Sequence, residues 1–164
     1  MPFRSRVVIL ASALLLLLTS CSSTGEARQS PSALSVTSAL AESFPVSGGY
    51  AAYDESALRL YFPESCAALQ DCAVIYSVRP DDYTEIGVFR LPEETDLRAV
   101  THEVEAYLSE FRETYFPQAE LYDKDQKTKL SDAAVRVIDR YVIYTVMSEK
   151  EQRLFWKSAR TLLS

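Results

Sequence analysis

Residues 72–91, CAVIYSVRPDDYTEIGVFRL, contain two short apolar runs on either side of a polar turn. In residues 72–79, β-branched and aromatic side chains alternate with others, a pattern that is typical of strands. Residues 80–82, Pro-Asp-Asp, favour a turn, and residues 85–91 again have the composition of a strand. The stretch therefore predicts an antiparallel β-hairpin.

A long amphipathic helix is expected to follow this hairpin. Thr95 or Asp96 is a suitable N-cap residue, and apolar side chains then recur at steps of three and four, as they do along one face of a helix. This apolar stripe consists of Leu97, Val100, Val104, Leu108, Phe111 and Tyr115. Pro117 is expected to end or offset the helix.

The C-terminal part of the chain follows the same plan. Residues 133–138 and 141–147 are predicted to form a second hairpin around Asp139-Arg140. Ser148 is expected to cap a last helix, because acidic residues follow it in the first turn. Short helical segments are also expected in residues 33–44, 54–71 and 118–132.

These elements predict an α+β fold. Hairpins pair their strands in antiparallel fashion, and amphipathic helices need an apolar surface to cover. We expect a two-layer sandwich, in which a four-stranded antiparallel sheet from the two hairpins (ββα-ββα) carries its helices on one face. Short N-terminal helices precede this sheet.

The N-terminus has the pattern of an export signal. Arg4 and Arg6 precede an apolar run over residues 7–18, which is shorter than the roughly 20 residues that a membrane-spanning helix needs. Residues 18–21, LTSC, look like a bacterial lipobox. That resemblance implies that Cys21 receives a diacylglycerol group and fatty acids such as palmitate. The alternative is an ordinary signal peptide with a chance cysteine.

Three regions follow from this interpretation: a lipoprotein signal peptide (residues 1–20), a lipidated flexible tether (21–32) and a single domain (33–164). Removal of the signal peptide leaves 15 basic and 23 acidic residues, a net charge of −8 against −6 for the whole chain. This charge argues against nucleic acid as a partner and against electrostatic binding to anionic lipid. We expect the domain on the extracytoplasmic face of the cell membrane, held there by its lipid anchor.

Two further cysteines and the tryptophan are candidate site residues. Cys66 and Cys72 are an even pair in an exported chain, so a disulfide between them is expected; the alternative is two buried thiols that never meet. Trp156 lies beside the apolar stripe of the last helix, and we expect it to be half-exposed at a partner or ligand surface. The ten tyrosines and seven phenylalanines indicate either a recognition surface or ordinary core packing.

No catalytic, metal or cofactor site is predicted. His102 is the only histidine and is expected on the solvated face of the long helix. A calcium loop that starts at Asp123 has Thr128 at the glycine position and Ala134 at the glutamate position, so it fails the pattern. One histidine and a cysteine pair do not make a zinc site.

Several stretches resemble the family known as domain of unknown function 4358 (DUF4358), which consists of small lipoproteins and exported proteins found mainly in Firmicutes. The resemblance covers roughly residues 33–164. The residues that carry it are ALRLYFPESCAALQDCAVIYSVRPDDYTEIGVF, FRETYFPQAELY and VRVIDRYVIYTVMSE. The cysteine pair and the DKDQKTK segment depart from the usual form of the family. The resemblance implies export and this fold, and it assigns no activity and no site residues.

The sequence thus predicts a membrane-anchored, exported lipoprotein. We expect it to be a non-enzymatic binding module for a protein or another component of the cell envelope. The alternative is an envelope enzyme, or an enzyme accessory, whose site is assembled from residues far apart in the chain. A deep pocket with converging polar groups favours the enzyme, whereas a flat aromatic patch favours the binding module.

Overall fold

The computed structural model describes residues 30–68 and 71–164. These residues form an α+β fold with six helices and five strands, and Pro31–Ser164 make up one compact unit. The helices are α2 (Ala33–Ser43), α3 (Glu55–Tyr61), α4 (Pro63–Ala68), α5 (Leu97–Tyr122), α6 (Lys124–Asp132) and α7 (Glu149–Leu163). The strands are β1 (Tyr50–Ala52), β2 (Asp71–Ser77), β3 (Glu85–Arg90), β4 (Ala134–Ile138) and β5 (Tyr141–Val146).

The five strands form one antiparallel sheet in the order β1-β2-β3-β5-β4. Both predicted hairpins are confirmed, since β2 pairs with β3 and β4 pairs with β5. Strands β3 and β5 join the two hairpins, with Gly87 opposite Tyr144. The prediction of four strands is wrong, because β1 pairs with β2 and adds a fifth strand at the edge.

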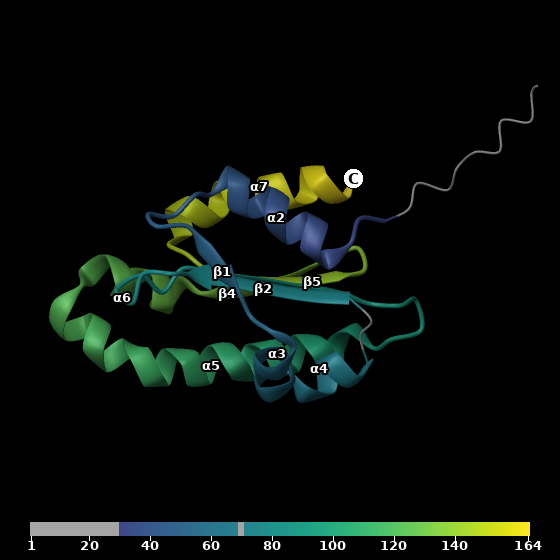
Figure 1. Cartoon of the computed structure of the whole chain (residues 1–164), viewed down its shortest axis with the longest axis horizontal. Coiled ribbons are helices and arrows are strands. Elements are labelled where there is room, and N and C mark those ends of the chain that lie inside the picture. Colours follow the sequence, from purple (N-terminus) through teal and green to yellow (C-terminus); the bar gives the residue numbers. More distant parts are fainter. Residues whose placement is uncertain (1–29, 69–70) are drawn as a thin grey trace, which may run out of the picture. The chain divides into compact units, whose positions relative to one another are not determined.

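Helices cover both faces of this sheet (Figure 1). On one face, α2 and α7 enclose a core that contains Ile75, Ile86 and Phe155. On the other face, α5 together with α3 and α4 encloses a core that contains Phe62 and Phe89. The expectation of a two-layer sandwich with helices on one face is therefore corrected to three layers. Five consecutive residues of β3 are buried, which requires cover on both faces of the sheet.

Helix α5 is longer than the sequence predicts. Its N-cap is Asp96, whose side chain accepts the backbone N–H of Arg98 at 2.9 Å. The helix runs through Pro117, so of the two alternatives for this residue, the one in which it ends the helix is wrong. Proline removes one helical hydrogen bond, but Ala119 beyond it is buried in the core and holds the last turns in place. The chain then enters α6 through the N-cap residue Asp123.

The described part of the chain begins at the junction with the predicted tether. Tyr141 donates its hydroxyl hydrogen to the backbone oxygen of Pro31, and Ser32 caps α2. The predicted signal peptide and Cys21 lie outside the described residues. Among the residues that are described, no helix combines the length and the hydropathy that a bilayer crossing needs.

Candidate functional site

A buried carboxyl group lies at the start of β3, on the side of the sheet that faces α5. Glu85 is only 1% exposed, yet three tyrosine hydroxyls donate to it. Tyr107 donates to Oε1 at 2.7 Å and Tyr53 donates to Oε2 at 3.0 Å, while Tyr144 also donates to Oε1. We call these four residues the Glu85 cluster. They satisfy most of the hydrogen-bonding capacity of a carboxyl group that burial removes from water.

The Glu85 cluster joins elements that are far apart in the sequence. Tyr53 follows β1 directly, Tyr107 lies on α5 and Tyr144 lies on β5. The hydroxyl oxygens of Tyr53 and Tyr107 are 3.2 Å apart, so the tyrosines also contact each other. The cluster is therefore a product of the tertiary fold and not of any local motif.

Gly87 makes room for this arrangement. A Cβ atom at this position would lie 2.0 Å from Cε1 of Tyr144, which is its cross-strand partner. Because glycine has no side chain, the Tyr144 ring can lie flat against β3 and its hydroxyl can reach Glu85, two residues along the strand. The glycine thus determines where the tyrosine hydroxyl lies.

The environment of the cluster changes the acidity of its members. Burial raises the pKa of the Glu85 carboxyl above the ordinary value of glutamate, and the hydrogen bonds from the tyrosines oppose that rise. Burial, followed by the charge of Glu85, raises the pKa of Tyr53, Tyr107 and Tyr144. The three hydroxyls therefore stay protonated at neutral pH and remain hydrogen-bond donors.

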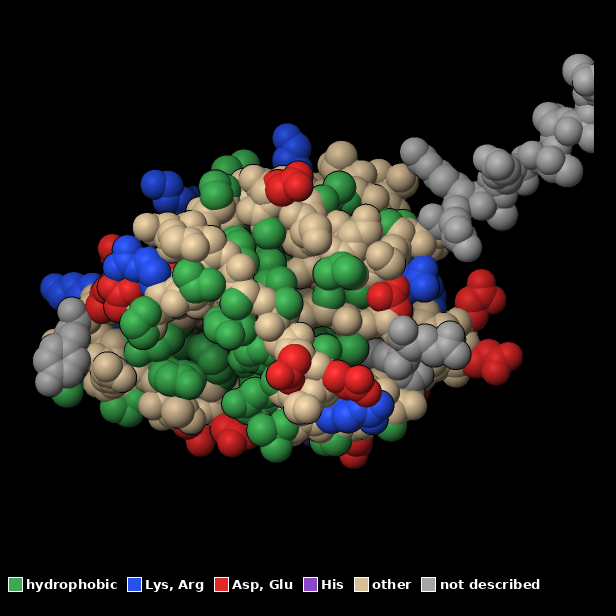
Figure 2. Space-filling model, viewed as in Figure 1, with side chains coloured by type: hydrophobic (Ala, Val, Ile, Leu, Met, Phe, Trp, Pro, Cys, Tyr) green, Lys and Arg blue, Asp and Glu red, His purple; other side chains and the backbone are tan. Residues whose placement is uncertain are grey.

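The Glu85 cluster borders an open cleft of about 280 Å³ between the sheet and α5, which we call the tyrosine cleft. Its floor includes the buried residues Ser77, Thr84 and Glu85. Figure 2 shows hydrophobic side chains gathered in a hollow on this face of the molecule. The residues that line the cleft are Tyr53, Tyr76, Ser77, Val78, Arg79, Pro80, Asp82, Tyr83, Thr84, Glu85, Phe111 and Tyr115.

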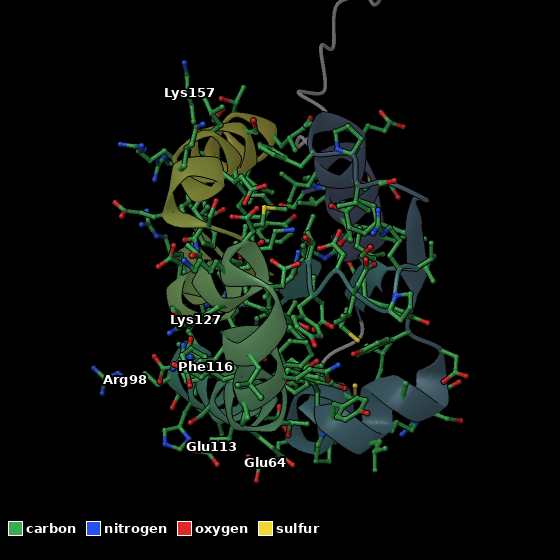
Figure 3. The ribbon with its side chains drawn as sticks, turned by 90° about the vertical axis from the view of Figure 1, so that its left-hand side faces the viewer. Glu64, Arg98, Glu113, Phe116, Lys127 and Lys157 are labelled. Atoms are coloured by element: carbon green, nitrogen blue, oxygen red, sulfur yellow. The ribbon has the colours of Figure 1, made fainter. Side chains whose placement is uncertain are left out.

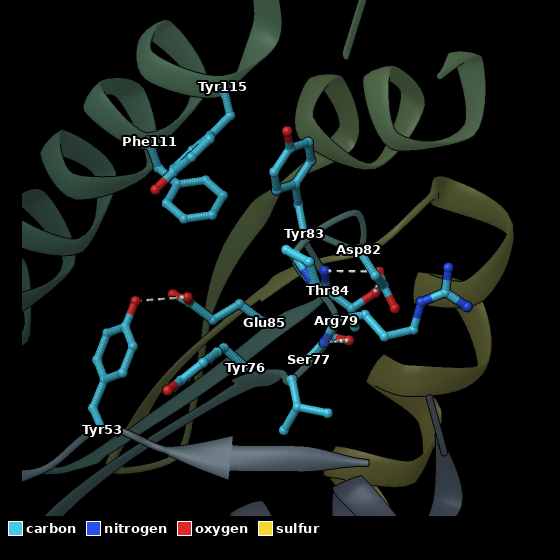
Figure 4. A pocket seen from close by; sticks show the side chains of 12 residues that line it. Tyr53, Tyr76, Ser77, Arg79, Asp82, Tyr83, Thr84, Glu85, Phe111 and Tyr115 are labelled. Atoms are coloured by element: carbon cyan, nitrogen blue, oxygen red, sulfur yellow. Dashed lines mark hydrogen bonds between the residues drawn. The ribbon is translucent and has the colours of Figure 1, made fainter. Parts of the chain in front are cut away.

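Aromatic rings form two walls of the tyrosine cleft, with the Glu85 carboxyl between them (Figure 4). On one side, the ring centroids of Tyr53 and Tyr76 are 5.1 Å apart. On the other side, Tyr115 lies 4.7 Å from Phe111 and 5.0 Å from the ring of Tyr83.

Two of these wall residues also reach solvent. Tyr76 is 37% exposed and Tyr115 is 36% exposed, so each wall presents an aromatic ring at the surface. A smaller cavity of about 190 Å³ adjoins the cleft, shares Tyr53, Phe111 and Tyr115 with it, and adds Tyr61 and Glu110. The aromatic surface therefore continues along α5 beyond the cleft itself.

Helix α6 fixes the turn that forms the rim of the cleft. Gln126 accepts the backbone N–H of Tyr83 at 2.9 Å. Lys129 donates to Asp82 at 2.8 Å and to the Thr84 hydroxyl at 2.7 Å. Burial disfavours the charged form of Asp82, but the hydrogen bonds from Lys129 and Thr84 outweigh this and hold its pKa below the ordinary value. The rim is thus held in place before any ligand arrives.

The two cysteines that the sequence singles out do lie close together. The sulfur atoms of Cys66 and Cys72 are 3.9 Å apart, and both residues are free thiols. Burial raises the pKa of Cys66 and raises that of Cys72 to about 12, which disfavours the reactive thiolate. The two thiols are thus in contact but not bonded, and the disulfide stays a prediction.

Trp156 is not the exposed residue that the sequence analysis expects. It is 2% exposed, and its ring nitrogen donates to Gln152 at 3.1 Å. The guanidinium carbon of Arg136 lies 4.9 Å from the ring centroid and covers the indole from β4. The buried stripe of α7 is therefore wider than the pattern of apolar residues suggests, and Trp156 is part of the core rather than half-exposed.

The remaining candidates are easily placed. Cys21 lies outside the described residues. His102 is exposed on α5, as expected from the sequence. Within residues 30–68 and 71–164, no group of three or more histidine, cysteine, aspartate or glutamate side chains is arranged to hold a metal ion.

In the sequence, Glu85 is not among the predicted site residues. It appears there only as the first residue of a strand, because its partners are 22, 32 and 59 positions away. One signal was present: Glu85 shares the period-two register of Gly87 and Phe89, which is the side of β3 that faces α5. An acidic residue in that register needs hydrogen-bond partners, and the tyrosines were the donors available.

Comparison with known proteins gives no match: no protein-family model, no curated protein and no solved structure is significantly similar to this chain.

Proposed function

We propose that the protein is an exported lipoprotein, anchored to the outer face of the cell membrane through Cys21, whose folded domain binds an envelope component in the tyrosine cleft. The lipobox-like residues 18–21 support the anchor. The resemblance to domain of unknown function 4358 supports export and leaves the ligand to be derived from the cleft. In this proposal the domain is a non-enzymatic binding module.

The observation that carries the proposal is the combination of exposed aromatic rings with a buried carboxyl group in one cleft. Exposed rings such as Tyr76 and Tyr115 forgo the stabilisation that burial would give. A buried carboxyl such as Glu85 lowers stability unless it is fully bonded. Both features belong to the lining of one cleft, and departures from a simple core are typical of functional sites. Tyrosine is also enriched in recognition surfaces.

An envelope enzyme, or an enzyme accessory, is the second candidate. A carboxyl group with a raised pKa at a cavity is also what a general acid needs. However, both oxygens of Glu85 accept tyrosine hydroxyls, and the other carboxylate of the cleft, Asp82, is held by Lys129 and Thr84. Because these two carboxyl groups are hydrogen-bonded within the protein, they are less suited to transfer a proton to a substrate, and binding without catalysis is favoured.

A binding assay with the anchored protein tests the proposal. The full chain is placed in phosphatidylglycerol vesicles through its own lipid, and labelled envelope extract is added in increasing amounts. We expect saturable binding that is lost in the double variant Tyr76→Ala/Tyr115→Ala. Leu34→Ala is the matched control, because Leu34 is 61% exposed on α2, on the opposite face of the sheet.

The outcomes separate the candidates. Binding that survives the double variant contradicts the cleft as the binding site. Turnover of an envelope substrate that Glu85→Gln abolishes would instead establish the enzyme. Normal folding of each variant is checked by its circular dichroism spectrum, so that loss of binding is not confused with loss of structure.

A further inference from the structure

The geometry points to a specific ligand class for the tyrosine cleft: we propose that it takes the head group of an alkylammonium compound, with aromatic faces around the cation and Glu85 as its counter-ion. This inference rests on the proposed function, since it names the ligand of the same site.

The walls of the cleft provide the first argument. A cation is attracted to the face of an aromatic ring within about 6 Å of the ring centroid, and several rings around one point add their effects. Tyr53 and Tyr76 form one wall, and Tyr83, Phe111 and Tyr115 form the other. A head group between these walls would contact rings on two sides.

The hydrogen bonding of Glu85 provides the second argument. A carboxylate has about four acceptor sites. Oε1 accepts from Tyr107 and Tyr144, and Oε2 accepts from Tyr53. Oε2 thus accepts one hydrogen bond where Oε1 accepts two, and Glu85, although only 1% exposed, is among the residues that line the cleft. A quaternary ammonium group has no N–H to donate, so it would act on the carboxylate by charge. A cation there would offset the burial of the carboxylate charge.

The charges around the cleft provide the third argument. The basic residues of the rim are already paired with acids: Arg79 with Asp81, and Lys129 with Asp82. Within the described residues, Glu85 is not paired with a basic side chain, and its partners are neutral hydroxyls. The negative charge of an ionised Glu85 is thus left for a ligand to balance.

The polar groups of the cleft argue against a sugar as the ligand. Sugars are held by hydrogen bonds to many hydroxyl groups, but the side chains of Ser77, Asp82 and Thr84 already bond within the protein. The cleft volume of about 280 Å³ also lies at the lower limit of pockets for drug-sized ligands. A compact head group fits these features better than an extended glycan.

The same chemistry already occurs elsewhere on this molecule. The ammonium nitrogen of Lys127 lies 5.3 Å from the ring centroid of Phe116 (Figure 3). Here the cation is part of the chain and also contacts Glu120 at 2.8 Å. An aromatic ring together with a carboxylate is therefore a combination that binds an ammonium group in this protein.

The test compares choline with 3,3-dimethylbutan-1-ol, which has nearly the same shape but a carbon atom in place of the charged nitrogen. The full chain in phosphatidylglycerol vesicles is titrated with each compound by calorimetry at a series of pH values up to roughly pH 9, because burial raises the pKa of Glu85 above the ordinary carboxyl range. Empty vesicles give the blank. We expect choline to bind at least about tenfold more tightly than its neutral analogue.

Three variants assign the binding to the cleft. Glu85→Gln and Tyr115→Leu should each weaken choline binding on the order of tenfold, because one removes the counter-ion and the other removes a ring. Glu113→Gln is the matched control, since this exposed acid on α5 is not part of the cleft lining and its loss should leave choline binding unchanged.

Other results would overturn the inference. Equal binding of the neutral analogue, absence of choline binding, or an equal effect of Glu113→Gln each contradicts a cation site. Binding of a chitooligosaccharide that depends on Tyr115 would identify a sugar site instead. If choline fails while envelope extract still binds in a cleft-dependent way, the ligand class is wrong but the proposed binding function stands.

Discussion

The Glu85 carboxyl is removed from water, so its hydrogen bonds decide whether it stabilises or destabilises the fold. Three tyrosine hydroxyls donate hydrogen bonds to it, and Glu85 is the only carboxylate of the cluster that can accept them. Removal of the carboxyl by Glu85→Ala should therefore lower the free energy of unfolding by about 2 kcal/mol or more, because buried hydroxyls lose their acceptor. Glutamine keeps an acceptor oxygen and should be tolerated far better.

The pH dependence of stability offers a sharper test of Glu85. Its pKa is raised in the folded state, so the native protein binds a proton more tightly than the unfolded chain. The contribution of Glu85 to the free energy of unfolding should be fully present below the unfolded pKa of glutamate and should be lost as the pH rises through the folded pKa. We expect Glu85→Gln to lack this decline, when the free energy of unfolding is measured with urea across the pH range.

Asp82 provides an internal contrast in the same titration. The pKa of Asp82 is lowered in the folded state. Its contribution to the free energy of unfolding is therefore present above the unfolded pKa of aspartate and is lost as the pH falls through the folded pKa. The two effects thus have opposite signs and act in different pH windows. A Glu85→Gln curve parallel to that of the wild type would show that the buried carboxyl does not titrate as described. Glu113→Gln, an exposed acid on the same side, is the control.

Gly87 should tolerate no side chain while Tyr144 lies across it. In Gly87→Ala, the new methyl group would collide with the tyrosine ring, and overpacking of this kind costs about 2 kcal/mol. The cost should become much smaller when Tyr144 is replaced by valine, because the ring is then absent. A double-mutant cycle measured by chemical unfolding checks this. Strictly additive costs would mean that the two residues do not interact.

At the level of helices and strands, local sequence patterns predict those elements that local interactions form. The two hairpins follow from β-branched and aromatic residues on either side of turn residues. The cap at Ser148 follows from Glu151 three residues later, and the structure has the complete capping box. Helix α2 also occurs within the predicted range 33–44.

The features that could not be predicted depend on contacts between residues that are far apart in the sequence. Strand β1 is only three residues long and exists because β2 offers it an edge. Residues 74 and 75 are both apolar, which marks a strand covered on both faces, but periodicity alone does not say which helix covers which face. Helix α5 continues past Pro117 because Ala119 packs in the core. The Glu85 cluster escaped prediction for the same reason, since its four residues meet only after folding.

The contact between α4 and β2 allows a test of the predicted disulfide. Mild oxidation of the purified chain should remove two hydrogens and join Cys66 to Cys72, whose sulfurs are already 3.9 Å apart. Closing this short loop should raise the free energy of unfolding by about 2 kcal/mol. Mass spectrometry before and after reduction measures the bond, and urea unfolding measures the gain.

The double variant Cys66→Ser/Cys72→Ser is the control for that experiment, because oxidation should leave its mass and its stability unchanged. In the reduced protein, alkylation of both thiols should be slow at neutral pH, since burial raises their pKa values. Rapid alkylation together with no bond after oxidation would contradict a paired site.

In the molecule as a whole, the tyrosine cleft lies at the end of the sheet where β2 turns into β3, between that turn and α5. Both cores close within the single unit Pro31–Ser164. The proposed recognition at the cleft and the proposed attachment through Cys21 can therefore be tested by separate substitutions.

The anchor is tested by metabolic labelling in a bacterium that processes lipoproteins. The wild-type chain should incorporate a palmitate analogue and should lose residues 1–20. Cys21→Ala should remain unlabelled and uncleaved, because the thiol is the group that receives the lipid. Normal processing of Cys21→Ala, or an unlabelled wild type, would show that the segment is an ordinary signal peptide.

Recognition through the cleft is tested in intact cells by photo-crosslinking. The photoreactive residue p-benzoylphenylalanine is placed at Tyr76, which is 37% exposed beside the cleft, and in a second chain at Val137, which is 45% exposed on the opposite edge strand. We expect a discrete adduct from position 76 that Glu85→Gln weakens, and no such adduct from position 137. Equal adducts from both positions, or an adduct from position 137 alone, would contradict the cleft as the place where this protein meets its ligand.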